Sequence, residues 1–169
     1  MRTYSKAAVV AIVALATLLV GASSALADSA KFDRRNTFVV PPGVQDNGSL
    51  SVHFRETGLG NTPNPVAYTL SADADAVYAC QNNGGNFPSD PKKTAVSAHL
   101  ETNASLNAEN GNVEATLSIG PPPNTALTCP GSQHAVLVSV SYENVQICDT
   151  DHDVCFSFAG TFSRTFFMI

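Results

Sequence analysis

The feature that most constrains this fold is an alternation of apolar and polar residues that recurs along most of the chain. Between Val96 and Leu106 the apolar residues occupy even positions, and from Val113 to Ile119 they occupy odd positions. A period of two is the side-chain period of a β-strand with one buried and one solvated face. Beyond the N-terminal segment the sequence shows no sustained helical period. It therefore predicts an all-β chain of antiparallel strands.

The first predicted hairpin joins those two segments through Asn110-Gly111, a dipeptide that suits the positive φ angles of a two-residue turn. Counting back from this turn pairs Leu106 with Ala115, and Ala104 with Leu117. Nearly every apolar residue then faces another, and a slip of one residue would separate them. We therefore predict that both segments are neighbours in one sheet.

A second hairpin is predicted at the C-terminal end of the chain. The apolar residues change phase near Glu143-Asn144, which indicates a β-bulge with one extra residue. If residues 150–153 form the loop, Cys148 lies directly opposite Cys155 and the neighbouring apolar residues share the buried face. This register predicts a disulfide bond within the hairpin.

Shorter alternating runs, separated by turn-forming clusters, bring the total to about eight strands. Such a pattern is typical of an antiparallel β-sandwich, immunoglobulin-like or of similar topology. The shorter runs are Leu50–Phe54, Val66–Leu70, Ala76–Cys80 and a possible first strand, Thr37–Val40, which Pro41-Pro42 would stop.

The N-terminal residues 1–27 have a basic start, an uncharged apolar stretch and an Ala-Leu-Ala end, which is typical of a cleaved secretory signal peptide. The alternative is an uncleaved anchor, although the apolar run is short for a membrane span. We expect residues 28–48 to be an N-terminal extension and residues 49–169 to be the sandwich domain. No later segment is long and apolar enough to span a bilayer, so the mature protein should be secreted and extracellular.

The net charge of the chain limits which class of binding partner is expected. The whole chain has 9 Lys and Arg residues against 14 Asp and Glu residues, and its net charge is -5. Loss of Arg2 and Lys6 with the signal peptide leaves 7 basic against 14 acidic residues, a net charge of -7. Nucleic acid is therefore not an expected partner, since phosphates are bound by a surplus of Lys and Arg.

The four cysteines favour two disulfide bonds in an exported chain. If Cys148 pairs with Cys155, Cys80 and Cys129 are left to pair with each other. The alternative is a zinc site that uses Cys148, His152 and Cys155, although the chain has no Cys-x-x-Cys motif.

One candidate metal site lies in the loop of the second hairpin. Asp149, Asp151 and Asp153 place three carboxylates at alternate positions, and calcium favours such clusters. The glycine and the final acidic residue of an EF-hand loop are missing, because Val154 and Gly160 stand at those positions. A polar hairpin tip is therefore the preferred interpretation, and we expect no cofactor, with calcium as the alternative.

A second candidate site is an amide-rich loop after Cys80. Amide side chains can hydrogen-bond a sugar or a peptide, and loops often carry function. The alternative is a long turn shaped by the backbone preferences of Asn and Gly. The candidate ligand-binding residues are Gln81, Asn82, Asn83, Asn86 and Phe87.

No catalytic motif accompanies the four histidines, which are His53, His99, His134 and His152. The sequence has neither a Gly-x-Ser-x-Gly nor a His-Glu-x-x-His pattern, and its cysteines are assigned to bridges. We therefore expect a protein without catalytic activity. Asn47 and Asn103 begin N-glycosylation sequons, which matter only in a host that glycosylates.

Several sequence blocks together resemble a group of small secreted proteins of filamentous actinobacteria that has no established function. The resemblance covers most of the mature chain, and it implies separate pairing of Cys80 with Cys129 and of Cys148 with Cys155, because only the first pair belongs regularly to the group. An actinobacterial origin also implies little relevance for the sequons. The blocks are Phe54–Gly60, Tyr78–Asn86, Cys129–Gly131, Val140–Val145 and Gly160–Phe166.

Taken together, the sequence predicts a secreted, disulfide-stabilised β-sandwich that binds a cell-surface or extracellular component, either a carbohydrate or a protein. The first alternative is a calcium- or metal-dependent module that uses the loop Asp149–Asp153. The second alternative is an unrecognised hydrolase.

Overall fold

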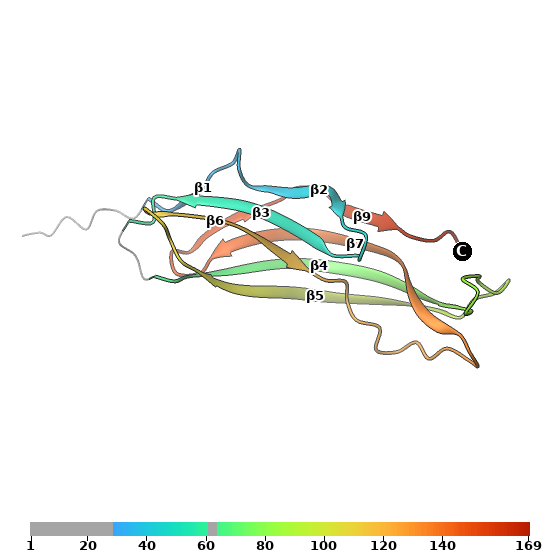
Figure 1. The fold of residues 1–169 in the computed structure, drawn as a ribbon. Coiled ribbons are helices and arrows are strands. Elements are labelled where there is room, and N and C mark those ends of the chain that lie inside the picture. Colours follow the sequence, from blue (N-terminus) through green and yellow to red (C-terminus); the bar gives the residue numbers. More distant parts are fainter. Residues whose placement is uncertain (1–28, 61–63) are drawn as a thin grey trace, which may run out of the picture.

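The computed structural model describes residues 29–60 and 64–169. This part of the chain contains nine β-strands and no helix, and the strands form two antiparallel sheets packed face to face (Figure 1). The predicted β-sandwich is therefore confirmed, with nine rather than about eight strands. Within the described residues no helix could cross a membrane. The predicted signal peptide, residues 1–27, lies outside these ranges.

The first sheet is built around β3 (Leu50–Thr57), the strand that pairs on both sides. One side of β3 pairs with two strands in succession, β1 (Lys31–Phe32) and β2 (Phe38–Val44). The other side pairs with β6 (Asn112–Ile119) along its whole length.

The second sheet has longer strands, in the order β5 (Lys93–Leu106), β4 (Val66–Gln81) and β7 (His134–Asp149). The far side of β7 pairs with two short strands, β8 (Val154–Ser157) and β9 (Phe162–Thr165). Because β4 and β7 have 16 residues and β3 has 8, the second sheet extends well beyond the first (Figure 1).

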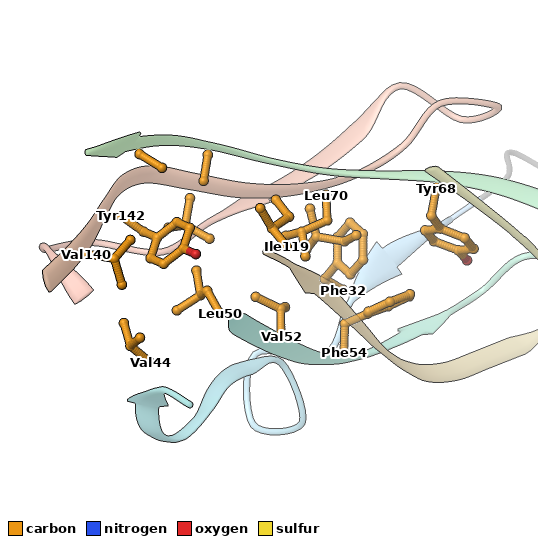
Figure 2. Close-up of a cluster of buried hydrophobic side chains, with 14 of the residues drawn as sticks. Phe32, Val44, Leu50, Val52, Phe54, Tyr68, Leu70, Ile119, Val140 and Tyr142 are labelled. Atoms are coloured by element: carbon orange, nitrogen blue, oxygen red, sulfur yellow. The ribbon is translucent and has the colours of Figure 1, made fainter. Parts of the chain in front are cut away.

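The core lies between the two sheets and follows directly from the alternation. Every second residue of β3 is buried, and Leu50, Val52 and Phe54 point toward side chains of the second sheet such as Leu70 and Tyr142 (Figure 2). Burial of these apolar side chains is the main stabilising contribution, about 1.5–3 kcal/mol for each large one.

The overhanging half of the second sheet is covered by the segment 120–133. A disulfide bond joins Cys80 at the end of β4 to Cys129 in this segment. Close by, the buried hydroxyl of Tyr78 donates a hydrogen bond to the carbonyl of Pro122 at 2.6 Å. These two links hold an irregular segment over apolar residues that the shorter first sheet cannot reach.

The predicted hairpin around Asn110-Gly111 is only half correct. The turn forms, with positive φ angles of 51° and 72°, but the two strands that it joins belong to different sheets. Leu106 pairs with Val66 rather than with Ala115, and Ala115 pairs with Phe54. The alternation could not distinguish strands paired in one sheet from strands that face each other in two sheets, because the apolar residues have a period of two in both cases.

The C-terminal hairpin is confirmed in its register. Cys148 lies opposite Cys155 in the β7–β8 pair, and the two residues form the second disulfide bond. The predicted bulge is also present, because the pairing shifts from Ser71 with Gln146 to Asp73 with Glu143. Two residues of β7 therefore oppose one residue of β4 at this point.

The N-terminal boundary differs from the prediction. Residues 31–44, expected to belong to an extension, form β1 and β2 of the first sheet, and Phe32 and Val44 are buried in the core. Strand β2 also continues through Pro41-Pro42, with a shift of its register against β3 between Val39 and Val44. The sandwich therefore begins before residue 49.

Candidate functional site

A surface pocket lies at the edge of the second sheet, where β8 ends and β9 has not yet begun. Strand β8 pairs with β7 as far as Gln146, and β9 resumes the pairing at Tyr142. Between them the chain loops away from the bulged part of β7 and leaves a cavity of about 490 Å³. We call this cavity the bulge pocket. Its lining consists of residues 143–146 of β7 and residues 157–161.

The polar side chains of the bulge pocket are held in place by one another. Thr161 Oγ1 donates to Glu143 Oε1 at 2.9 Å, and Gln146 Nε2 donates to Ser157 Oγ at 2.9 Å. Asn144 donates through Nδ2 to Asp73 at 2.7 Å. These bonds leave the second carboxylate oxygen of Glu143 and the single amide oxygens of Asn144 and Gln146 available to accept from a ligand.

The outer face of the second sheet continues from this pocket as an acidic surface. His99 Nδ1 lies 2.7 Å from Asp73 Oδ1, beside a second, shallower hollow of about 330 Å³. Hydrogen bonds from Asn144 and His99 lower the pKa of Asp73, and the bond to Asp73 raises the pKa of His99. Ser97 donates to the neighbouring Asp75.

A second polar cluster is enclosed between the two sheets. Glu56 of β3 and Asp149 of β7 are fully buried. The hydroxyl of Tyr68 donates to Glu56 Oε2 at 2.7 Å, and His152 Nδ1 lies 2.5 Å from Asp149 Oδ2. Glu56 therefore connects the first sheet to polar groups of the second, and we call these four residues the inter-sheet cluster.

Burial shifts the pKa values of Glu56 and Tyr68 in the inter-sheet cluster. It raises the pKa of Glu56 from 4.5 to about 7; the hydrogen bond from Tyr68 opposes this rise, and the nearby Asp149 adds to it. Burial, with the carboxyl group of Glu56 beside it, also raises the pKa of the Tyr68 hydroxyl. Glu56 Oε1 has no hydrogen-bond partner among the described residues, and burying such an atom costs less in a protonated carboxyl group than in a carboxylate.

The three carboxylates of the predicted calcium loop have separate roles in the structure. Asp149 points inward, where Oδ1 accepts from the backbone nitrogens of Asp151 and His152 at 2.9 and 3.1 Å. Asp151 Oδ2 instead accepts from the backbone nitrogen of Ala67 at 2.8 Å. Asp153 adopts a positive φ of 55° in the turn. Across residues 29–60 and 64–169, no group of three or more acidic, His or Cys side chains is placed to hold a metal ion. The alternative zinc site is wrong, because its two cysteines are bonded to each other.

The predicted amide loop folds mainly onto itself. Asn82 Oδ1 accepts from the backbone nitrogens of Gly84 and Asn86 at 3.0 and 2.9 Å, and Gln81 donates to the carbonyl of Gly85 at 2.9 Å. Phe87 packs edge to face on Phe167, with ring centroids 5.4 Å apart. The side chain of Asn83 is exposed. These bonds stabilise the turn, and a ligand-binding role for the loop stays a prediction.

The four histidines lie in four different parts of the sandwich. His53 is on the outer face of the first sheet beside Thr116 and Glu114, and His99 is on the outer face of the second sheet. His134 begins β7, and His152 belongs to the inter-sheet cluster. The structure therefore does not bring them to one site.

Sequence reasoning missed both the bulge pocket and the inter-sheet cluster. A signal for the cluster was present, because Glu56 shares the inward parity of Val52 and Phe54 in β3. The signal for the bulge pocket was weaker. The predicted bulge lies at the pocket, but the sequence did not indicate that β9 replaces β8 as the neighbour of β7 there.

Comparison with known proteins gives no family assignment. No protein-family model matches the chain, and neither a curated protein nor a solved structure is detectably similar to it. The resemblance to small secreted actinobacterial proteins therefore stays a prediction.

Proposed function

We propose that this chain is a secreted, non-catalytic sugar-binding protein whose ligand site is the bulge pocket. The observation that carries the proposal is that residues with a carboxylate, two amides and two hydroxyl groups line one cavity, together with Phe158. A volume of about 490 Å³ lies in the usual range for small-ligand sites.

The chemistry of the pocket favours a ligand that is rich in hydrogen-bond donors. The oxygens left available on Glu143, Asn144 and Gln146 are all acceptors, and they match sugar hydroxyl groups or an amine. The internal hydrogen bonds hold these side chains before a ligand arrives, which lowers the entropic cost of binding. The carboxylates of Glu143 and Asp73 would further favour an amino sugar over an acidic one.

Export is supported by the disulfide bonds. All four cysteines of the chain are paired in the structure, and such bonds persist in oxidising compartments. Intact-mass measurement on protein from the culture medium should give a chain that starts at Asp28. A chain that stays in the membrane fraction with its N-terminus intact would contradict export.

The absence of catalysis is proposed on the placement of the titratable groups. Glu56 and Asp149, the two carboxyl groups of the inter-sheet cluster, are fully buried. The inter-sheet cluster is therefore better suited to holding the sheets together than to meeting a substrate.

The test is a glycan array followed by calorimetry on the secreted protein. We expect retention of a neutral or amino sugar, with binding weakened at least tenfold by Glu143→Ala or Gln146→Ala, since each removes an acceptor worth about 1.5 kcal/mol. The matched control is Glu114→Ala on the outer face of the first sheet, which should bind as the wild type does. Retention of no sugar, or equal binding by all three variants, would refute the proposal.

A further inference from the structure

The second sheet has one long edge that carries no partner strand. Strand β5 pairs with β4 without interruption from Lys93 to Leu106. On its other side, a hydrogen bond from Thr102 Oγ1 to the carbonyl of Ser118 at 3.2 Å links β5 to the first sheet. Between Lys93 and Leu100 no other described strand pairs with β5. In Figure 1 strand β5 lies at the margin of the second sheet beside β4, and the segment 120–133 passes below its Lys93 end.

The β5 edge lacks four of the features that commonly prevent two edges from pairing, namely short length, proline, a β-bulge and an inward-pointing charge. The other edge of the second sheet is divided between β8 and β9, with 4 residues each, and β2 contains two prolines. Strand β5 has 14 residues, with no proline and no bulge against β4. Its inward positions carry no charge, since they are Thr94, Val96, Ala98, Leu100, Thr102, Ala104 and Leu106. Proteins that avoid edge pairing commonly use just these devices.

The inward side of this edge is incompletely covered. Val96 and Leu100 pack against the core but stay partly exposed, whereas Leu70 and Tyr142 deeper in the sheet are fully buried. A further strand alongside β5 would remove this apolar surface from water.

The side chains of β5 complement a second copy of the same strand. In an antiparallel pair with a two-fold axis at Ser97, Lys93 of one copy faces Glu101 of the other, and this contact occurs twice. The same register places Val96 opposite Ala98 on the inward side and keeps all outward residues together. Opposite charges directly across a strand pair stabilise it, and like charges destabilise it.

We propose that the protein forms a symmetric dimer through its β5 edges, with the two-fold axis at Ser97. The dimer joins two five-stranded sheets into one continuous sheet and closes both free edges. The bulge pocket lies beside β7, away from this interface, so each dimer carries two open pockets.

The first test introduces a cysteine at the axis. Directly opposite residues of antiparallel strands have Cα atoms about 4.5–5.5 Å apart, which is within reach of a disulfide bond. All native cysteines are already paired, so Ser97→Cys adds one thiol. We expect the oxidised variant to run as a covalent dimer on non-reducing gels. Ser105→Cys, exposed on the same strand, is the control, because its two copies would be roughly 50 Å apart in this register.

The second test exchanges the charges. Lys93→Glu should weaken dimerisation roughly tenfold in sedimentation equilibrium, because two attractive contacts become repulsive. The double variant Lys93→Glu, Glu101→Lys should restore the wild-type dissociation constant. Lys31→Glu in the first sheet makes the same change of net charge and should leave dimerisation unchanged.

Three results would overturn the proposal. They are a wild-type protein that stays monomeric at millimolar concentration, equal cross-linking of Ser97→Cys and Ser105→Cys, and a charge-exchanged double variant as weak as Lys93→Glu.

Discussion

Replacing Glu56 with Gln should remove a pH dependence from the stability of the sandwich. In the folded protein Glu56 is fully buried and its pKa is raised to about 7, first by burial and then by the nearby Asp149. In the unfolded chain the same carboxyl group has its ordinary pKa of 4.5. The folded state therefore holds a proton over a pH range in which the unfolded state has released it.

The direction of the effect follows from this difference. Between pH 4.5 and about 7 the folded state binds more protons, so a rise in pH favours unfolding. The stability is fully present below pH 4.5 and is lost as the pH rises through about 7. At about 1.4 kcal/mol per pH unit the loss reaches about 3 kcal/mol. For a domain of this size that loss lowers the melting temperature by on the order of 10 °C.

Gln is the informative substitution because it keeps the shape and the hydrogen bonds of a neutral Glu56. Its carbonyl oxygen can accept from Tyr68, as Glu56 Oε2 does. It cannot ionise. The Glu56→Gln protein should therefore be about 3 kcal/mol more stable than the wild type at pH 9 and nearly equal to it at pH 4.

The assay is urea unfolding of the disulfide-bonded protein, followed by far-UV circular dichroism from pH 4 to pH 9. His99 has a raised pKa through its bond to Asp73, but it is present in both proteins and its contribution cancels in the difference. Glu114→Gln, an exposed site on the outer face of the first sheet, is the matched control and should follow the wild type. Parallel stability profiles for the wild type and Glu56→Gln would refute the argument.

The structure supports three further predictions. Removing the Cys80–Cys129 bond with paired Ser substitutions should lower the free energy of unfolding in urea by about 4 kcal/mol, and removing Cys148–Cys155 should lower it by about 2 kcal/mol. The difference arises because the loops that the two bonds close span 49 and 7 residues. An equal loss for the two bonds would contradict the loop-entropy account. Tyr142→Phe should lower the free energy of unfolding by about 1–2 kcal/mol, since it leaves the buried carbonyl of Gly48 without its hydrogen-bond donor. An unchanged urea midpoint would mean that water or another group replaces the hydroxyl. Gly58→Ala should destabilise the fold far more than Gly85→Ala. Both glycines have a positive φ, but only the substitution at Gly58 would place a Cβ 2.5 Å from the backbone oxygen of Ser29. Equal melting temperatures for the two variants would count against this contact.

Local patterns predicted most of the strands and one complete hairpin. In β7 and β8 the loop is short, so the register that pairs Cys148 with Cys155 follows from counting residues back from the turn. The bulge near Asn144 was also visible, since a change in the phase of the apolar residues can only be accommodated by an extra residue. These features depend on neighbours in the chain, which a sequence displays directly.

The candidate site was less predictable because it depends on distant segments. The bulge pocket exists because β9 replaces β8 as the neighbour of β7, and this change of neighbour does not alter the alternation of apolar and polar residues. The inter-sheet cluster brings Glu56 within 2.7 Å of Tyr68, which belongs to the other sheet. No periodicity indicates which carboxylate will meet which hydroxyl across a core.

The sequence by itself determined the β-class of the fold, the buried face of most strands and the disulfide bond of the last hairpin, because each depends on the side-chain period or on a short turn. Only the tertiary structure decided that the segments flanking Asn110-Gly111 separate into two sheets. The physical reason is that the apolar side chains of two strands are removed from water with the same gain in free energy whether the strands are neighbours in one sheet or lie in opposite sheets. The choice between the two is made by the packing of the whole domain, and it places the bulge pocket, the inter-sheet cluster and the open edge of β5.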